Sequence, residues 1–152
     1  DVQYIHSSIQ KPSAEITKAL KLDQNVDIFK SYKIFTADMK PIIYCVNTMP
    51  LSLFDKKFIE ELTDNPSALE PLYDVLKNKC NLYVENHLSR IHPATAENCD
   101  FFGGLPLEKG TPILVIDAIA YDTHGHPLFH TFEYTTDNEI TYELIRRRTP
   151  GS

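Results

Sequence analysis

The chain is poor in cysteine and in long hydrophobic runs, and it has no excess of positive charge. Its three cysteines, Cys45, Cys80 and Cys99, form no Cys-x-x-Cys pair, and an odd number fits a reducing compartment better than a disulfide framework. The longest apolar stretches, such as 112–120, fall well short of the ~20 residues that span a bilayer. The N-terminus lacks the pattern of a secretory signal. We therefore expect a cytoplasmic protein that does not enter a membrane.

The absence of a net positive charge argues against DNA binding by this chain alone. The formal net charge is −6, whereas a domain that binds DNA phosphates normally has a basic face. The basic cluster at 146–148 lies at the extreme C-terminus, and three consecutive strand residues cannot all point the same way. We interpret it as a solvated chain end. With 42% hydrophobic residues, residues 1–152 are expected to form a single domain.

The spacing of apolar residues predicts an α+β domain. Residues 26–35 alternate too persistently for a helix, whereas 51–62 place Phe54, Phe58 and Leu62 on one helical face. The predicted strands are 26–35, 41–47, 82–92, 111–121, 128–135 and 140–147, and the predicted helices begin at 12, 51, 71 and 93 and end near 22, 62, 80 and 99. This order favours a six-stranded antiparallel sheet with helices packed on it.

Histidines gather around one predicted hairpin, at His124, His126 and His130. Two of them lie in a turn beside Gly125 and Pro127, where exposed polar residues are expected in any case. No His-Glu-x-x-His motif or cysteine pair supplies converging carboxylate or thiolate ligands. We therefore predict no metal site and no cofactor.

Catalytic motifs are also missing. The sequence has no Gly-x-Ser-x-Gly elbow, and its thiols lack the sequence context of a known nucleophile family. The glycine pair at 103–104 precedes Leu105 and Pro106, which cannot open a phosphate-binding helix. The chain is therefore predicted not to be an enzyme.

A binding pocket built from strand side chains remains. Residues that point away from the predicted core would line it, and these are Lys33, Phe35, Cys45, Arg90, His92, His130, Phe132 or Glu133, and Tyr142. Each is weak evidence alone, because a single cation on a strand is usually solvated and an interior tyrosine is usually part of the core.

A series of short motifs resembles the UTRA ligand-binding domains found behind a winged helix in the HutC branch of GntR regulators. Residues 12–22 are similar to the family's opening helix, 36–42 to its Ala-Asp-Gly-x-Pro turn, 49–50 to its Leu-Pro, and 71–76 to its Ser-Leu-Tyr-x-x-Leu. Further blocks lie at 91–96 and 105–108. Residues 110–114, 121–127 and 134–137 match Gly-x-Pro-Leu-Leu, Tyr-Asp-x-x-Gly-x-Pro and Tyr-x-x-Asp. The order and spacing are those of the family over nearly the whole chain.

The resemblance implies a chorismate-lyase-like fold, a homodimer, and a pocket for a small polar metabolite. Binding of this effector, a sugar phosphate or another anionic metabolite, would alter the DNA affinity of an attached winged helix. We expect no winged helix within this chain, because the segment before Pro12 is too short to hold one. DNA would then be a partner only through that absent domain.

The resemblance also suggests site residues. Family members that sense phosphosugars use two basic residues on the first strand and an acid on the second, at positions that resemble Lys33, Phe35 and Cys45 here. Only one cation remains, so a phosphosugar is disfavoured because phosphate prefers several donors. Pro71 stands where the family has serine. The expected ligand-binding residues are Lys33, Phe35, Cys45, Tyr73, Arg90, His92, Glu133 and Tyr142.

Two other functions stay open. A chorismate-lyase-like enzyme acting on a small carboxylic acid would need cationic clamps and an acid, for which Lys33, Arg90 and Glu133 are the available set. A dimerisation module without a ligand would keep the sheet but fill the pocket with side chains.

Overall fold

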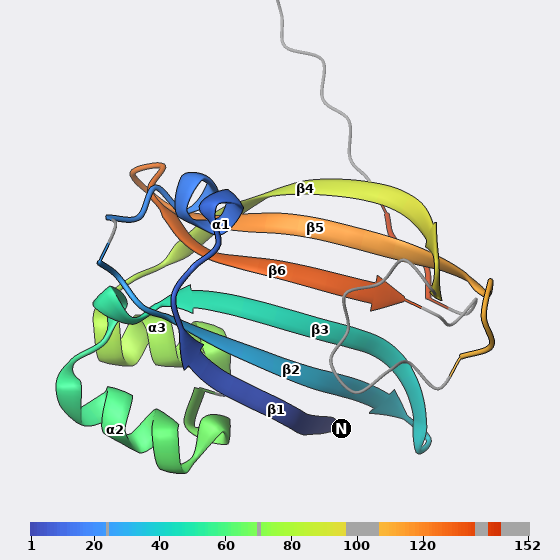
Figure 1. Ribbon diagram of the computed structural model, residues 1–152, viewed down its shortest axis with the longest axis horizontal. Coiled ribbons are helices and arrows are strands. Elements are labelled where there is room, and N and C mark those ends of the chain that lie inside the picture. The colour runs from blue at the N-terminus through green and yellow to red at the C-terminus, as the bar shows by residue number, and fades with distance from the viewer. Residues whose placement is uncertain (24, 70, 97–106, 136–139, 144–152) are drawn as a thin grey trace, which may run out of the picture.

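One antiparallel sheet carries the fold of this computed structural model, which describes all residues except 24, 70, 97–106, 136–139 and 144–152 (Figure 1). Within the described residues the sheet has six strands in the order β1-β2-β3-β6-β5-β4. The strands are β1 (Val2–Gln10), β2 (Ile28–Ala37), β3 (Lys40–Pro50), β4 (Val84–Thr95), β5 (Pro112–Asp122) and β6 (Pro127–Thr135). The predicted α+β class and antiparallel sheet are confirmed.

Helices lie on both faces of the sheet. The short helix α1 (Ala14–Ala19) packs over one face, and α2 (Lys56–Asp64) and α3 (Leu72–Cys80) cover the other (Figure 1). Two 3-10 helices, η1 (Leu51–Leu53) and η2 (Pro66–Leu69), connect β3 to α2 and α2 to α3. The single sheet therefore separates an α1 side from an α3 side.

Local sequence explains where the elements begin and turn. The Ser13 hydroxyl accepts the backbone N–H of Ile16 at 3.2 Å, which caps α1. The β2–β3 hairpin turns through Asp38 and Met39, whose φ angles are 48° and 64°. Two consecutive left-handed residues match the right-handed twist of the paired strands, although such positions favour asparagine and glycine.

The core divides between the two faces of the sheet. The larger cluster lies on the α3 side, where Leu62, Leu69 and Leu76 are fully buried against Phe29 and Met49 of the sheet. The smaller cluster lies on the α1 side, and its buried members are Tyr32, Tyr44, Val46, Ile113, Val115 and Tyr134. Each face also has a pocket beside its helices, and these two pockets are described below.

Several predicted elements were wrong. The predicted helix at 51–62 is broken, because the Asp55 carboxylate accepts the Phe58 N–H at 2.8 Å and starts α2 there. The predicted helix from Pro93 is instead the end of β4, and 97–99 lie outside the described residues. β4 is an edge strand in the described sheet, where a proline does not remove a required ladder hydrogen bond.

The two ends of the chain also differ from the prediction. No element was predicted before Pro12, yet β1 occupies Val2–Gln10 and pairs with β2. The predicted last strand, 140–147, is not a strand at 140–143, and 144–147 lie outside the described residues. In that segment the Tyr142 hydroxyl lies 2.7 Å from the Thr135 hydroxyl, so its side chain packs against the end of β6.

Candidate functional site

The strand register gathers polar side chains on the α3 side of the sheet. Residues opposite each other on neighbouring strands point to the same face. One cross-strand row on this face contains Lys33, Cys45, Glu133 and Ile116, and the next contains Ser31, Asn47, Thr131, Ala118 and Ser89. Most of these polar groups are buried, so this part of the sheet is a polar floor beside an apolar core.

A pocket of about 540 Å³ opens above these rows, and we name it the α3-side pocket. Five of the eight predicted ligand residues line it: Lys33, Phe35, Cys45, Tyr73 and Glu133. Pro71, at the start of α3, lines it as well, together with Asn47, Leu72, His87, Ser89, Ile116, Ala118, Phe129 and Thr131. Residues predicted from separate motifs therefore converge in one hollow.

The other three predicted residues lie elsewhere. Arg90 and His92 line a second pocket on the α1 side, because alternate residues of β4 point to opposite faces and His87 and Ser89 take the α3 side. Tyr142 contacts Thr135 and lines neither pocket. The eight residues thus do not form a single site.

A lysine and a carboxyl group define the electrostatics of the α3-side pocket. Lys33 is only 3% exposed, and its Nζ lies 5.5 Å from the centre of the Phe35 ring. Burial raises the pKa of the Glu133 carboxyl, and the positive charge of Lys33 partly opposes this rise. A pocket with one buried cation and a carboxyl that is easily protonated can accept a single anionic group together with hydroxyl groups.

The floor of the pocket is held by side-chain hydrogen bonds. The Cys45 thiol donates to the amide oxygen of Asn47 at 3.3 Å and lies 3.5 Å from the Thr131 hydroxyl. Both contacts join neighbouring positions of the polar rows, so these three side chains are fixed before any ligand binds.

Aromatic residues form one wall at the mouth of the pocket. The Tyr73 hydroxyl on α3 lies 3.3 Å from Nε2 of His87 on β4, and both rings pack edge-on to Phe129. Burial raises the pKa of Tyr73, with a further contribution from the charge of Glu133. Burial lowers the pKa of His87, which favours the neutral imidazole.

Sequence reasoning did not select His87, Ser89, Asn47 or Thr131 as site residues. Their strands were predicted, and so was the hairpin of 26–35 with 41–47, but the register of the strand pairs was not, so the residues directly opposite Lys33 and Cys45 were unknown. The alternation of β4 was a usable signal for His87 and Ser89, since it separates them from Arg90.

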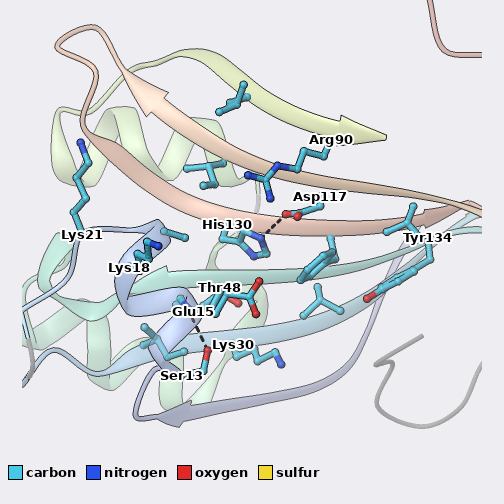
Figure 2. Close-up of a pocket in the computed structure, with 18 of the residues that line it drawn as sticks. Ser13, Glu15, Lys18, Lys21, Lys30, Thr48, Arg90, Asp117, His130 and Tyr134 are labelled. Carbon is cyan, nitrogen blue, oxygen red and sulfur yellow. Dashed lines mark hydrogen bonds and ion pairs between the residues drawn. The ribbon is translucent and has the colours of Figure 1, made fainter. Parts of the chain in front are cut away.

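The α1-side pocket has a volume of about 820 Å³ and is lined by residues of α1 and of the sheet, including its central strands β3 and β6 (Figure 2). At its floor, Nε2 of His130 lies 2.7 Å from the Asp117 carboxylate, and the His130 ring packs edge-on to Phe132. Figure 2 shows Arg90 extending from β4 over the side where this pair lies. Charged residues of its rim include Glu15, Lys18, Lys21 and Lys30.

Comparison with known proteins identifies the family. A family model for the UTRA domain matches residues 1–140. The chain belongs to the UTRA domain family. The UTRA domain described here resembles, at 18% identity and a TM-score of 0.82, the ligand-binding domain of a GntR-family transcriptional regulator from Bordetella bronchiseptica, covering 97% of this chain and 88% of that chain.

Other solved structures share this fold. A transcriptional regulator from Enterococcus faecalis V583 has 18% identity and a TM-score of 0.77, with 96% of this chain and 100% of that chain covered. The effector-binding domain of the Bacillus subtilis trehalose repressor has 14% identity and a TM-score of 0.74, with 97% of this chain and 98% of that chain covered.

No curated protein sequence matches the chain. Among the described residues, no helix has both the length and the hydropathy needed to cross a membrane.

Proposed function

We propose that this UTRA domain is the effector-sensing part of a GntR-type transcription regulator of the HutC branch, and that it binds a small anionic metabolite in the α3-side pocket. The observation that carries the proposal is the convergence of Lys33, Cys45 and Glu133 in one cross-strand row beneath Tyr73. The ligand-binding and effector-binding roles of the structurally similar regulator domains support it.

The chemistry of the pocket narrows the class of effector. Lys33 is the basic residue among its lining residues, and Phe35 supplies no hydrogen-bond donor. One cation suits one carboxylate or one phosphate group, whereas a phosphate clamped by several donors is disfavoured. Hydroxyl groups of the effector would meet the amide of Asn47, the hydroxyl of Thr131 and the Glu133 carboxyl.

Effector binding would regulate DNA binding by shifting a conformational equilibrium. A ligand shifts such an equilibrium only by its difference in affinity for the two states. Coupling free energies between two sites are typically ~1–3 kcal/mol, which corresponds to roughly 5- to 150-fold in affinity. We propose that β1, which precedes α1 and pairs with β2, transmits the resulting conformational change to a winged-helix domain attached at its N-terminal side.

A homodimer is part of this proposal. β4 lies at one edge of the described sheet, and its residues from Glu85 to Pro93 are exposed on both faces. Leu88 and Ile91, 60% and 40% exposed, add apolar surface to this edge. An unpaired strand edge with exposed apolar side chains favours association with a second copy.

We place the regulator in the cytoplasm, where its DNA would be.

The enzyme alternative is disfavoured by the position of Arg90. A lyase site built from Lys33, Arg90 and Glu133 requires the three side chains to meet, but Arg90 lies on the opposite face of the sheet from the other two. The alternative of a dimerisation module without a ligand is disfavoured by the open volume of about 540 Å³ above a polar floor.

Thermal denaturation with a panel of carboxylates, sugar phosphates and amino acids tests the proposal. An effector at ~100 times its Kd is expected to stabilise the domain by roughly 2.7 kcal/mol. Lys33→Met removes the cation of the α3-side pocket, and Lys30→Met is the matched control because Lys30 is on the same strand but lines the α1-side pocket. We expect the effector to raise the melting temperature of Lys30→Met but not that of Lys33→Met.

Two results would contradict the proposal. If a ligand raises the melting temperature of Lys33→Met but not that of Lys30→Met, the effector site lies on the α1 side. No shift with any member of a broad panel would favour the dimerisation module. For the link to transcription, a winged helix fused before residue 1 is expected to show an operator affinity that changes with the effector.

A further inference from the structure

The β5–β6 turn brings two histidines and a carboxylate together outside both pockets. Nδ1 of His126 lies 3.1 Å from Oδ2 of Asp122, and Nδ1 of His124 lies 3.9 Å from the same oxygen. The three potential ligand atoms all lie within 4.8 Å of one another. The sequence alone predicted no metal site because no converging carboxylate was recognised, and Asp122 supplies one.

The turn holds this carboxylate in place without using the oxygen that faces the rings. Oδ1 of Asp122 accepts the backbone N–H groups of His124 and His126, both at 2.8 Å. These two bonds lower the pKa of Asp122. Oδ2 is therefore directed at the two imidazoles while the backbone bonds anchor the other oxygen.

The backbone of the turn is also fixed. The Gly125 N–H donates to the Asp122 carbonyl at 3.0 Å, and the Asp122 N–H donates to the His126 carbonyl at 3.0 Å. Gly125 has a φ of 78°, a conformation that glycine adopts without steric cost. The His124 and His126 rings are stacked, with centroids 6.0 Å apart and an angle of 24° between them. Both imidazoles therefore leave the turn on the same side as the carboxylate.

From this geometry we propose that Asp122, His124 and His126 form a binding site for a borderline first-row divalent cation, with Zn²⁺ as the probe. Two imidazoles and one carboxylate are ligands that suit zinc, and water completes the coordination of an open three-ligand site. Ligand atoms around zinc lie about 2.1 Å from the ion, hence roughly 3.4 Å apart in a tetrahedron. Small rotations of exposed rings are enough to reach that spacing.

The imidazole rings of His124 and His126 are exposed enough to rotate toward a bound ion. The side chains of His124 and His126 are 77% and 75% exposed, so their rings can turn without disturbing the core, while Asp122 is 10% exposed and fixed. The ion would replace the hydrogen shared between Nδ1 of His126 and Oδ2, and the contact at 3.3 Å between Nδ1 of His124 and the Thr123 hydroxyl would be given up. Coordination through Nδ1 requires the neutral tautomer of each ring with its single proton on Nε2, so a proton held on Nδ1 would be exchanged with solvent.

Isothermal titration of the chelator-treated chain with Zn²⁺ tests the site. One ion per chain is expected. His124→Gln, His126→Gln and Asp122→Asn are each expected to weaken binding by at least about tenfold, since lost interactions around a bound metal commonly cost 10–100-fold. The Asp122→Asn side chain keeps an oxygen for the two backbone N–H groups, so the turn is retained. His92→Gln, another exposed histidine, is the control and is expected to bind normally.

Long-range ¹H–¹⁵N spectra of the imidazoles supply a readout other than affinity. On addition of Zn²⁺, the Nδ1 resonances of both His124 and His126 are expected to shift, and Nε2 of each ring is expected to carry the proton. Equal affinity in the three turn variants and in His92→Gln would overturn the proposal. So would a stoichiometry of one ion per two chains, because that result would assign the ion to an intermolecular contact.

Discussion

Glu133 is the residue whose charge state most directly affects ligand binding in the α3-side pocket. Its folded-state pKa is raised by burial, so the carboxyl takes up a proton at a higher pH than an exposed glutamate. Such a group favours the folded state when protonated, and this contribution is lost as the pH rises through the raised pKa. Protonation also removes a negative charge beside Lys33.

Affinity for an anionic effector is therefore expected to increase as the pH falls through the titration range of Glu133. Isothermal titration across that range measures it, and Glu133→Gln should bind as the protonated form does and flatten the profile. Cys45, Tyr73 and Lys33 face the same pocket, and His87 also gains charge at low pH. His87→Gln is the control, and a profile abolished there but kept in Glu133→Gln would assign the effect to the histidine.

Met39 presents a second test at the scale of one residue. It is 95% exposed and has a φ of 64°, so its side chain makes little contact and its backbone is strained. Met39→Gly is expected to stabilise the fold by about 1 kcal/mol, because a left-handed conformation costs a non-glycine residue roughly 1–2 kcal/mol. Urea denaturation measures this, with Met39→Ala as a control expected to give no gain.

At the scale of elements, α3 carries much of the α3-side core. Leu76 is fully buried among Leu62, Leu69 and the sheet. Leu76→Ala is expected to destabilise the fold by ~2–5 kcal/mol, since it removes buried methyl groups and leaves a cavity. Asn78→Ala on the exposed side of the same helix is the control and is expected to change stability by no more than about 0.5 kcal/mol. Equal losses in chemical denaturation would mean that α3 is not packed as described.

The elements predicted correctly were those whose apolar pattern and flanking turn or proline residues indicate the same structure. β3 and β5 are long, apolar and bounded by turns, and α3 begins after a proline, so local signals sufficed. β1 was missed because its large apolar residues, at 2, 4, 5 and 9, do not alternate regularly, and the strand is defined by its pairing with β2. Pro93 was misread because its tolerance depends on β4 being at an edge, which is a property of the whole sheet.

The residues of the α3-side pocket were also predicted where local sequence sufficed and missed where the whole sheet decides. Lys33, Cys45 and Glu133 were suggested by motif positions, and the register unites them. Arg90 and His92 were grouped with them because a strand pattern shows which residues alternate but not which face meets which helix. Only the three-dimensional arrangement assigns them to the α1 side.

For the whole molecule, the exposed edge at β4 predicts how copies associate. If the chain forms the homodimer proposed above, Leu88→Asp is expected to convert it to a monomer, because the substitution places a charge on the apolar part of that edge. Sedimentation velocity measures this. Ile9→Asp, an exposed apolar residue on the opposite edge strand β1, is the matched control. A monomer produced by the control alone would shift the interface to β1.

The back-to-back arrangement of the two hollows constrains the length of β6. Phe132 faces one hollow and Glu133 the other, and the same alternation runs through the neighbours on β3 and β5. Inserting or deleting one residue there would exchange the residues that β6 contributes to the two linings, sending the glutamate to the α1 side and an aromatic ring to the α3 side. Chain-length changes are therefore tolerable at the turns but not inside this strand, whatever side chains it carries.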